Sequence, residues 1–178
     1  MKGRSLKSVI VLTVICFVIT LALAITNYVT APIIQEYQEK QQKEALYLVL
    51  PEASDFVKLD TDNIPETVEG IYEDESGTGY AVVLLASGYD SSKPINIVVG
   101  ISTEGKVTAC HVISCNGETS GIGTKISDIR FLDTFKDKDA SLDDVDTISG
   151  ATISSKAFIA AVKDAFVAYE SVRGGRGK

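Results

Sequence analysis

The sequence predicts an α+β fold in which one N-terminal membrane-spanning helix precedes an antiparallel sheet with a packed C-terminal helix. Three observations predict it: an uncharged apolar run from Val9 to about Tyr28, short apolar stretches separated by glycine-containing turns, and an amphipathic final segment. Consecutive hairpins favour an α+β layer, because parallel strands need longer crossover connections. We therefore expect one folded domain behind one anchor.

The apolar run near the N-terminus is long enough to cross a bilayer, which takes about twenty residues as a helix. We assign residues 8–30 to this transmembrane helix. Cations at Lys2, Arg4 and Lys7 precede it without a compensating acid, a pattern typical of a cytoplasmic end. The sequence thus predicts a single-pass protein of the cytoplasmic (inner) membrane, with residues 1–7 in the cytoplasm and the domain on the extracytoplasmic face.

A cleaved secretory signal is the alternative interpretation of the same run. The tripeptide Ala22-Leu23-Ala24 resembles a small-x-small cleavage site. The apolar pattern continues beyond it through Val29, which favours an uncleaved anchor.

The remaining organisation follows from prolines and composition. Pro32 is expected to interrupt the first helix, and residues 31–50 form a polar, membrane-proximal stalk that Pro51 ends. Residues 51–172 then make up the extracytoplasmic domain. Residues 173–178 are a basic, flexible tail that we expect to contact membrane lipid.

Within the domain, alternating turn signals and apolar runs predict four strands and a final helix. The turn Thr103–Gly105 supplies the glycine that a hairpin needs. The final helix, from Ser155 to about Val172, carries one apolar stripe for packing on the sheet. The expected strands are Thr67–Tyr72, Tyr80–Ser87, Asn96–Ser102 and Lys106–Ser114, and the stripe consists of Phe158, Ala161, Val162, Ala165, Phe166 and Tyr169.

Charge and cysteine content exclude several classes of partner. Eleven cations against twenty-four acids give residues 8–172 a net charge of −13, which disfavours nucleic acid. Cys110 and Cys115 are separated too far along a strand for a disulfide, and the single histidine, His111, has no ligand set around it. We therefore expect no metal site.

Two loops carry candidate chemistry. The segment Asn116–Lys125 holds three glycines that let a backbone approach a ligand, but Thr124-Lys125 reverses the order that a P-loop requires. The second segment, Asp146–Ser155, places several hydroxyls directly before the final helix. Such a segment is either an ordinary helix cap or an anion-binding helix start.

The order of these pieces resembles the FMN-binding domain family. The resemblance is carried by Gly117-Glu-Thr-Ser-Gly-Ile-Gly123, Phe131-Leu-Asp-Thr-Phe135 and Ser149-Gly-Ala-Thr-Ile-Ser-Ser155, and covers roughly residues 68–172. Together with the anchor, it is similar to the G subunit of the Rnf ion-translocating electron-transport complex. The related C subunit of the Na⁺-translocating NADH:quinone reductase is the alternative.

The resemblance implies a flavoprotein with covalent FMN whose phosphate is esterified to Thr152. Chemistry alone leaves Ser154 and Ser155 open as the esterified hydroxyl, because all three lie within one turn. The other cofactor-binding residues that the resemblance and the adjacent helix start imply are Ser149, Gly150, Ala151, Glu118, Thr119 and Lys156.

By the same resemblance, the chain would relay electrons between ferredoxin and NAD through other subunits, coupled to Na⁺ or H⁺ translocation. No independent catalytic site is expected in the chain itself. The implied partners are a flavin-bearing integral-membrane subunit and a flavin transferase for maturation. Two other classes stay open: a cofactor-free anchoring module at the outer surface, and a serine hydrolase, for which no nucleophile elbow is present.

Overall fold

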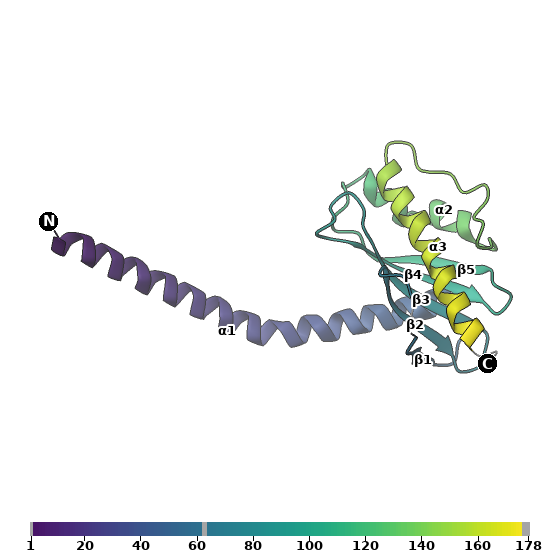
Figure 1. The fold of residues 1–178 in the computed structure, drawn as a ribbon, viewed down its shortest axis with the longest axis horizontal. Coiled ribbons are helices and arrows are strands. Elements are labelled where there is room, and N and C mark those ends of the chain that lie inside the picture. Colours follow the sequence, from purple (N-terminus) through teal and green to yellow (C-terminus); the bar gives the residue numbers. More distant parts are fainter. Residues whose placement is uncertain (1, 62–63, 176–178) are drawn as a thin grey trace. The chain divides into compact units, whose positions relative to one another are not determined.

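The structure, a computed structural model, describes residues 2–61 and 64–175, and the side chains of residues 7–61 and 64–174. The chain divides into two compact units, Met1–Gln41 and Gln42–Lys178. The first unit belongs to helix α1, and the second contains the sheet and the remaining helices (Figure 1).

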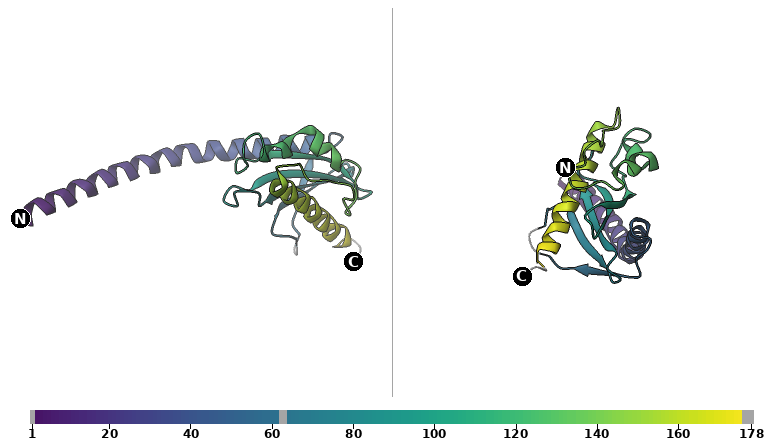
Figure 2. Two further views of the ribbon diagram at one scale, coloured as in Figure 1. Left: turned by 90° about the horizontal axis from the view of Figure 1, so that it is seen from above. Right: turned by 90° about the vertical axis from the view of Figure 1, so that its right-hand side faces the viewer.

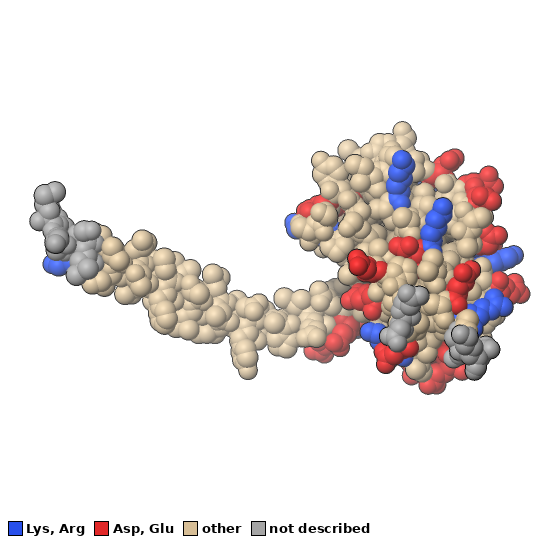
Figure 3. Space-filling view, in the orientation of Figure 1, with Lys and Arg blue, Asp and Glu red and all other residues tan. Residues whose placement is uncertain are grey.

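Helix α1 (Lys2–Val49) is continuous, and Pro32 lies inside it. The predicted interruption at Pro32 is therefore wrong. Proline removes one backbone hydrogen bond, to the carbonyl of Tyr28, but the bonds on either side keep the helix intact. Among the described residues, α1 alone is long and apolar enough to cross a membrane, and its long stretch without charged side chains is tan in Figure 3.

The sheet has five antiparallel strands in sequence order, so each strand pairs with the next along the chain. The four predicted strands are present with small shifts at their ends. The additional edge strand, β1, has only four residues and little burial, so its pattern is too weak to read. The strands are β1 (Phe56–Leu59), β2 (Val68–Asp74), β3 (Gly79–Ala86), β4 (Ile95–Ser102) and β5 (Val107–Ser114).

The predicted tight connection between β4 and β5 is confirmed. Gly105 has a φ of +78°, which glycine adopts without the steric cost that a side chain brings. The Gly105 N–H donates to the Ser102 carbonyl at 2.9 Å, and the Ser102 N–H donates to the Lys106 carbonyl at 2.8 Å.

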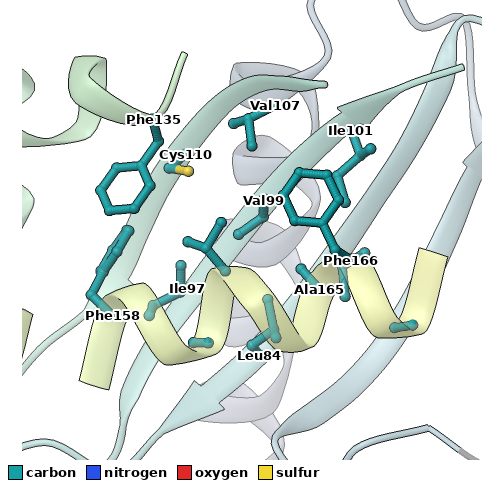
Figure 4. Packing of buried hydrophobic residues seen from close by; sticks show 14 of the residues in the cluster. Leu84, Ile97, Val99, Ile101, Val107, Cys110, Phe135, Phe158, Ala165 and Phe166 are labelled. Carbon is teal, nitrogen blue, oxygen red and sulfur yellow. The ribbon is translucent and has the colours of Figure 1, made fainter. Parts of the chain in front are cut away.

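Helix α3 (Thr152–Gly175) crosses one face of the sheet and closes the main core (Figures 1 and 4). Every residue of the predicted apolar stripe is buried there. Phe158 packs against Phe131 and Phe135, with ring centroids 5.4 and 5.1 Å apart, so this aromatic pair belongs to the core. The two phenylalanines come from the short helices α2 (Ile129–Leu132) and η2 (Asp133–Phe135), which follow η1 (Gly123–Ser127).

Both ends of α3 differ from the predicted ones. The helix begins at Thr152, three residues before the predicted start at Ser155. It continues to Gly175, so residues 173–175 are helical and are not a flexible tail. The rest of the predicted tail, residues 176–178, lies outside the described residues.

The last turns of α1 cover the opposite face of the sheet (Figure 2). The Thr108 hydroxyl donates to the Val49 carbonyl at 2.6 Å, and a Cβ at Gly100 would lie 2.6 Å from the same oxygen. The compact body therefore begins at Gln42, whereas the sequence placed the end of the stalk at residue 50. The packed side chains are Ala45, Leu46, Val49 and Leu50 against Ala81, Val83 and Val98.

Candidate functional site

A pocket of about 400 Å³ lies where α3 begins, between the hydroxyl-rich turn and the glycine-rich loop. Five of the seven cofactor-binding residues that the sequence implies line it, together with the candidate Ser154, so the fold brings the two loops together. The lining consists of Tyr89, Glu118, Thr119, Ile122, Gly123, Gly150, Ala151, Thr152, Ile153 and Ser154.

The turn before α3 is built on a glycine. Gly150 has a φ of +82°, and the Ala151 N–H donates to the Ile148 carbonyl at 3.0 Å, as in a turn whose third residue must be left-handed. The backbone bond from Ser155 N–H to the Ala151 carbonyl, 2.9 Å, opens the helix. Because the first N–H groups of a helix have no helical acceptor, those of residues 152–154 are available to an anion.

The hydroxyls at the start of α3 differ sharply in access. Thr152 is exposed at the pocket. Ser154 is 3% exposed and its hydroxyl donates to a Glu118 carboxylate oxygen. Ser155 is 0% exposed; its hydroxyl donates to the Ala151 carbonyl at 2.8 Å and accepts from the Ile148 N–H at 3.1 Å. Both serines therefore serve the local fold.

The carboxylate of Glu118 connects three segments beneath the pocket. It is 8% exposed, and its Oε1 accepts from the Tyr89 N–H at 2.9 Å, while Oε2 accepts from the Ser154 hydroxyl. A side chain at Gly88 would overlap Oε1, and a Cβ at Gly123 would lie 2.6 Å from Oε2. These two glycines thus make room for a carboxylate of the chain itself.

Thr119 shapes the adjoining loop through its backbone. Its carbonyl accepts from the Ile122 N–H at 3.1 Å and from the Thr124 N–H at 3.2 Å. The Thr124 hydroxyl accepts from the Gly121 N–H at 2.9 Å, and Gly121 has a φ of +73°. The loop is therefore internally bonded and exposes Thr119 at the pocket.

Three exposed apolar side chains, Tyr89, Ile122 and Ile153, line the pocket. The sequence analysis assigns these three residues no role. The feature that could have pointed to them is an apolar side chain next to a glycine or a hydroxyl residue in an otherwise polar loop. The lining therefore suits a planar, mostly apolar ring.

Ser149 and Lys156, which the sequence analysis also names as cofactor-binding residues, lie outside the pocket lining. Both are exposed. Lys156 is in the second turn of α3, one turn after Thr152, so its ammonium can reach an anion there only from the solvent side.

The remaining reactive side chains lie apart from this pocket. Burial raises the pKa of the Cys110 thiol, and burial together with the Glu118 charge raises that of Cys115. Burial lowers the pKa of His111, which lies on β5. The thiols are therefore held in their unreactive, protonated form.

Comparison with known proteins identifies both parts of the chain. The model of the FMN-binding domain matches residues 88–167, and that of the RnfG N-terminal region matches residues 1–49. The pocket residues all fall within the first match.

Three similar proteins cover nearly the whole chain. The G subunit of the ion-translocating oxidoreductase complex of Methanosarcina acetivorans is 32% identical, over 95% of this chain and 96% of its own length. The G subunit of the Na⁺-translocating ferredoxin:NAD⁺ oxidoreductase complex of Acetobacterium woodii is 30% identical, over 92% and 90%. The proton-translocating counterpart from Clostridium ljungdahlii is 27% identical, over 93% and 91%. The chain therefore belongs to the RnfG family, the G subunits of ion-translocating oxidoreductase complexes, and it carries that family's FMN-binding domain.

Proposed function

We propose that the chain is a membrane-anchored flavoprotein subunit that carries FMN on Thr152 and relays electrons within an Rnf-type complex. The observation that supports attachment at Thr152 is the difference in solvent exposure among the hydroxyl residues. Of the three that lie within the first turn of α3, Thr152 alone is exposed at the pocket, whereas Ser154 and Ser155 are buried and hydrogen-bonded.

The residues present fit both halves of FMN. The free N–H groups at the start of a 24-residue helix favour a phosphate, and the small, uncharged side chain of Ala151 lets it approach them closely. Tyr89, Ile122 and Ile153 offer apolar surface for the ring system. Gly150 leaves open space above the turn, since a Cβ there would meet no atom within 4 Å.

Attachment forms a bond between the Thr152 hydroxyl oxygen and the flavin phosphorus, and the hydroxyl proton leaves. The donor must carry an activated phosphate, so we propose a flavin dinucleotide whose diphosphate P–O bond breaks and releases a nucleoside monophosphate. A separate flavin transferase would catalyse this step. Once bound, FMN supplies one- and two-electron redox chemistry, while the chain binds and orients it.

A covalent link suits a flavin outside the cytoplasm, because a dissociated cofactor would have no pool from which to rebind. We propose that residues 1–7 are cytoplasmic, that α1 spans the cytoplasmic membrane through residues 8–30, and that the domain lies on the extracytoplasmic face. The proposed electron partner is a flavin-bearing integral-membrane subunit. Of two relatives with similar sequence identity to this chain, one is named as part of a Na⁺-translocating complex and the other as part of a proton-translocating complex. We propose that the complex containing this chain translocates one of these two cations.

The test is co-expression of the full chain with a flavin transferase, followed by denaturing electrophoresis and peptide mass mapping. We expect in-gel flavin fluorescence, an FMN adduct on the peptide that contains Thr152, and no fluorescence in Thr152→Ala. Thr147→Ala is the matched control, because it removes an exposed threonine hydroxyl five positions upstream, outside the pocket lining, and should stay fluorescent. A fluorescent Thr152→Ala protein would remove the assignment.

A further inference from the structure

We propose that Glu118 is a positioning residue: its carboxylate braces the first turn of α3 and so presents the Thr152 hydroxyl to the flavin-transferring enzyme. This inference rests on the proposed attachment of FMN to Thr152. Glu118 lines the same pocket but acts through its neighbours, without itself entering the attachment chemistry.

The brace joins parts of the chain that are far apart in sequence. Glu118 and Ser154 are separated by 36 positions, and Glu118 and Tyr89 by 29. The carboxylate lies between the start of α3 and the loop at Gly88 and accepts a hydrogen bond from each, so one side chain links the two. Because Glu118 is only 8% exposed, water has little access with which to replace the two donors.

The geometry around the carboxylate shows that the room for it is specific. Gly88 and Gly123 flank the two oxygens, and a side chain at either position would collide with them. Gly123 also lies close to the Ser154 hydroxyl, since a Cβ there would be 3.0 Å from that oxygen. Gly88 and Gly123 are thus required to make room for the Glu118 carboxylate, and no ligand has to be invoked to explain these two glycines.

Ser154 stands two residues after Thr152, in the turn that has the fewest helical hydrogen bonds. The first turn of a helix frays readily, because its N–H groups lack helical acceptors. The bond from Ser154 to Glu118 holds this turn from its buried side, while Thr152 faces the pocket. Without the brace, the turn would spend more time open and the exposed hydroxyl would lose its fixed place.

The test uses the full chain in detergent with purified flavin transferase and flavin dinucleotide, and follows the mass increase of the protein with time. We expect Glu118→Ala to slow attachment about tenfold, the loss expected for hydrogen bonds to a buried charged group. Glu118→Gln should restore most of the rate, since its amide oxygen can accept from the Tyr89 N–H and its amide N–H can donate to Ser154. An unchanged or faster rate in Glu118→Ala, or a Glu118→Gln protein as slow as it, overturns the proposal.

Asp74→Ala is the matched control for a merely structural loss. Asp74 is also a buried carboxylate, bonded by Ser76, Thr78 and the Ser54 N–H, but it lies in the β2–β3 hairpin, away from the pocket lining. We expect attachment at the wild-type rate in Asp74→Ala at a temperature where every variant is folded. An equal slowing in both alanine variants contradicts a specific role for Glu118.

Amide hydrogen exchange of the flavin-free chain gives a readout that needs no transferase. Exchange of the hydrogen-bonded N–H groups of Ala151 and Ser155 should rise about tenfold in Glu118→Ala and rise less in Ser154→Ala, with no change there in Asp74→Ala. If Glu118→Ala does not fold, Ser154→Ala tests the proposal in its place. Unchanged hydrogen exchange and an unchanged rate of attachment in Ser154→Ala then refute the role of Glu118. A wild-type chain that takes up no flavin refutes the proposed function instead. In that case the hydrogen-exchange result alone tests whether Glu118 stabilises the first turn of α3.

Discussion

A fragment that begins at Gln42 is expected to fold, whereas one that begins at Pro51, the domain start suggested by the sequence, is expected to be largely unfolded or to aggregate. The difference between them is the last part of α1, which covers the second face of the sheet. Residues 51–178 alone would expose that face, including Ala81, Val83 and Val98, to water.

The size of the effect follows from burial. Leu46, Val49 and Leu50 are each at most 4% exposed. Burying a Leu or Val side chain contributes about 1.5–3 kcal/mol, so the three together contribute roughly 5–9 kcal/mol. A small domain is stable by only about 5–15 kcal/mol in total. The shorter fragment therefore loses about a third of its stability at the least and all of it at the most, and the Thr108 hydroxyl loses its acceptor as well.

Urea denaturation of both fragments, followed by far-UV circular dichroism, measures this directly. Within the fragment that begins at Gln42, Leu46→Ala should cost about 2–5 kcal/mol, because it leaves a cavity under the helix. Leu48→Ala is the matched control: Leu48 is 59% exposed and its loss should cost below about 0.5 kcal/mol. Two fragments that unfold within about 1 kcal/mol of each other would refute the reasoning from burial.

Three further outcomes are expected. Gly88→Ala displaces Glu118 and should lower the midpoint of thermal unfolding more than Gly150→Ala does. The cost of Gly150→Ala is that of the left-handed backbone alone, about 1–2 kcal/mol. Equal shifts of the midpoint in the two variants would contradict this. Burial raises the pKa of Asp74, but its hydrogen bonds together lower it further, so the folded carboxyl titrates below its usual range. Its stabilisation is then complete above about pH 4 and is lost as the pH falls further, so Asp74→Asn should flatten acid unfolding below pH 4 in a urea titration. Cys110, whose pKa is raised by burial, should resist iodoacetamide at pH 8 in the folded protein and react once urea unfolds it, as read by peptide mass.

Much of the fold follows from local pattern, because the elements that form it also signal themselves locally. The stripe on α3 has helical spacing, and the β4–β5 connection has its glycine at the left-handed position. By contrast, β1 has four residues with partial exposure, and its place at the sheet edge depends on pairing with β2. No sequence window of that length can show such a pairing.

The errors at Pro32 and at the start of α3 have a shared physical cause. Rules for proline and for helix caps describe local preference, and neighbouring interactions override them. The helix bonds on both sides of Pro32 outweigh the one that it removes. At α3, the sequence favours Ser155 as the first helical residue, but the Ser155 N–H already donates to the Ala151 carbonyl, so the residues between them form the first turn and the helix starts at Thr152.

The sequence points to the hydroxyl-rich turn and to the loop that contains Glu118, but it does not show which hydroxyl is buried and which is exposed. A row of hydroxyls before a helix cannot reveal which of them is buried, because that depends on Glu118, which lies 36 positions from Ser154. Once Ser154 is bonded to Glu118 and Ser155 to the turn, both are withdrawn from solvent, and Thr152 is left facing the pocket. Under the proposed attachment, the folded domain itself would select one hydroxyl among the three, and the modifying enzyme would not need to distinguish them by sequence. A linear peptide spanning residues 146–160, in which all three hydroxyls are accessible, should accordingly be modified slowly and without preference, whereas the folded chain should be modified at Thr152 alone.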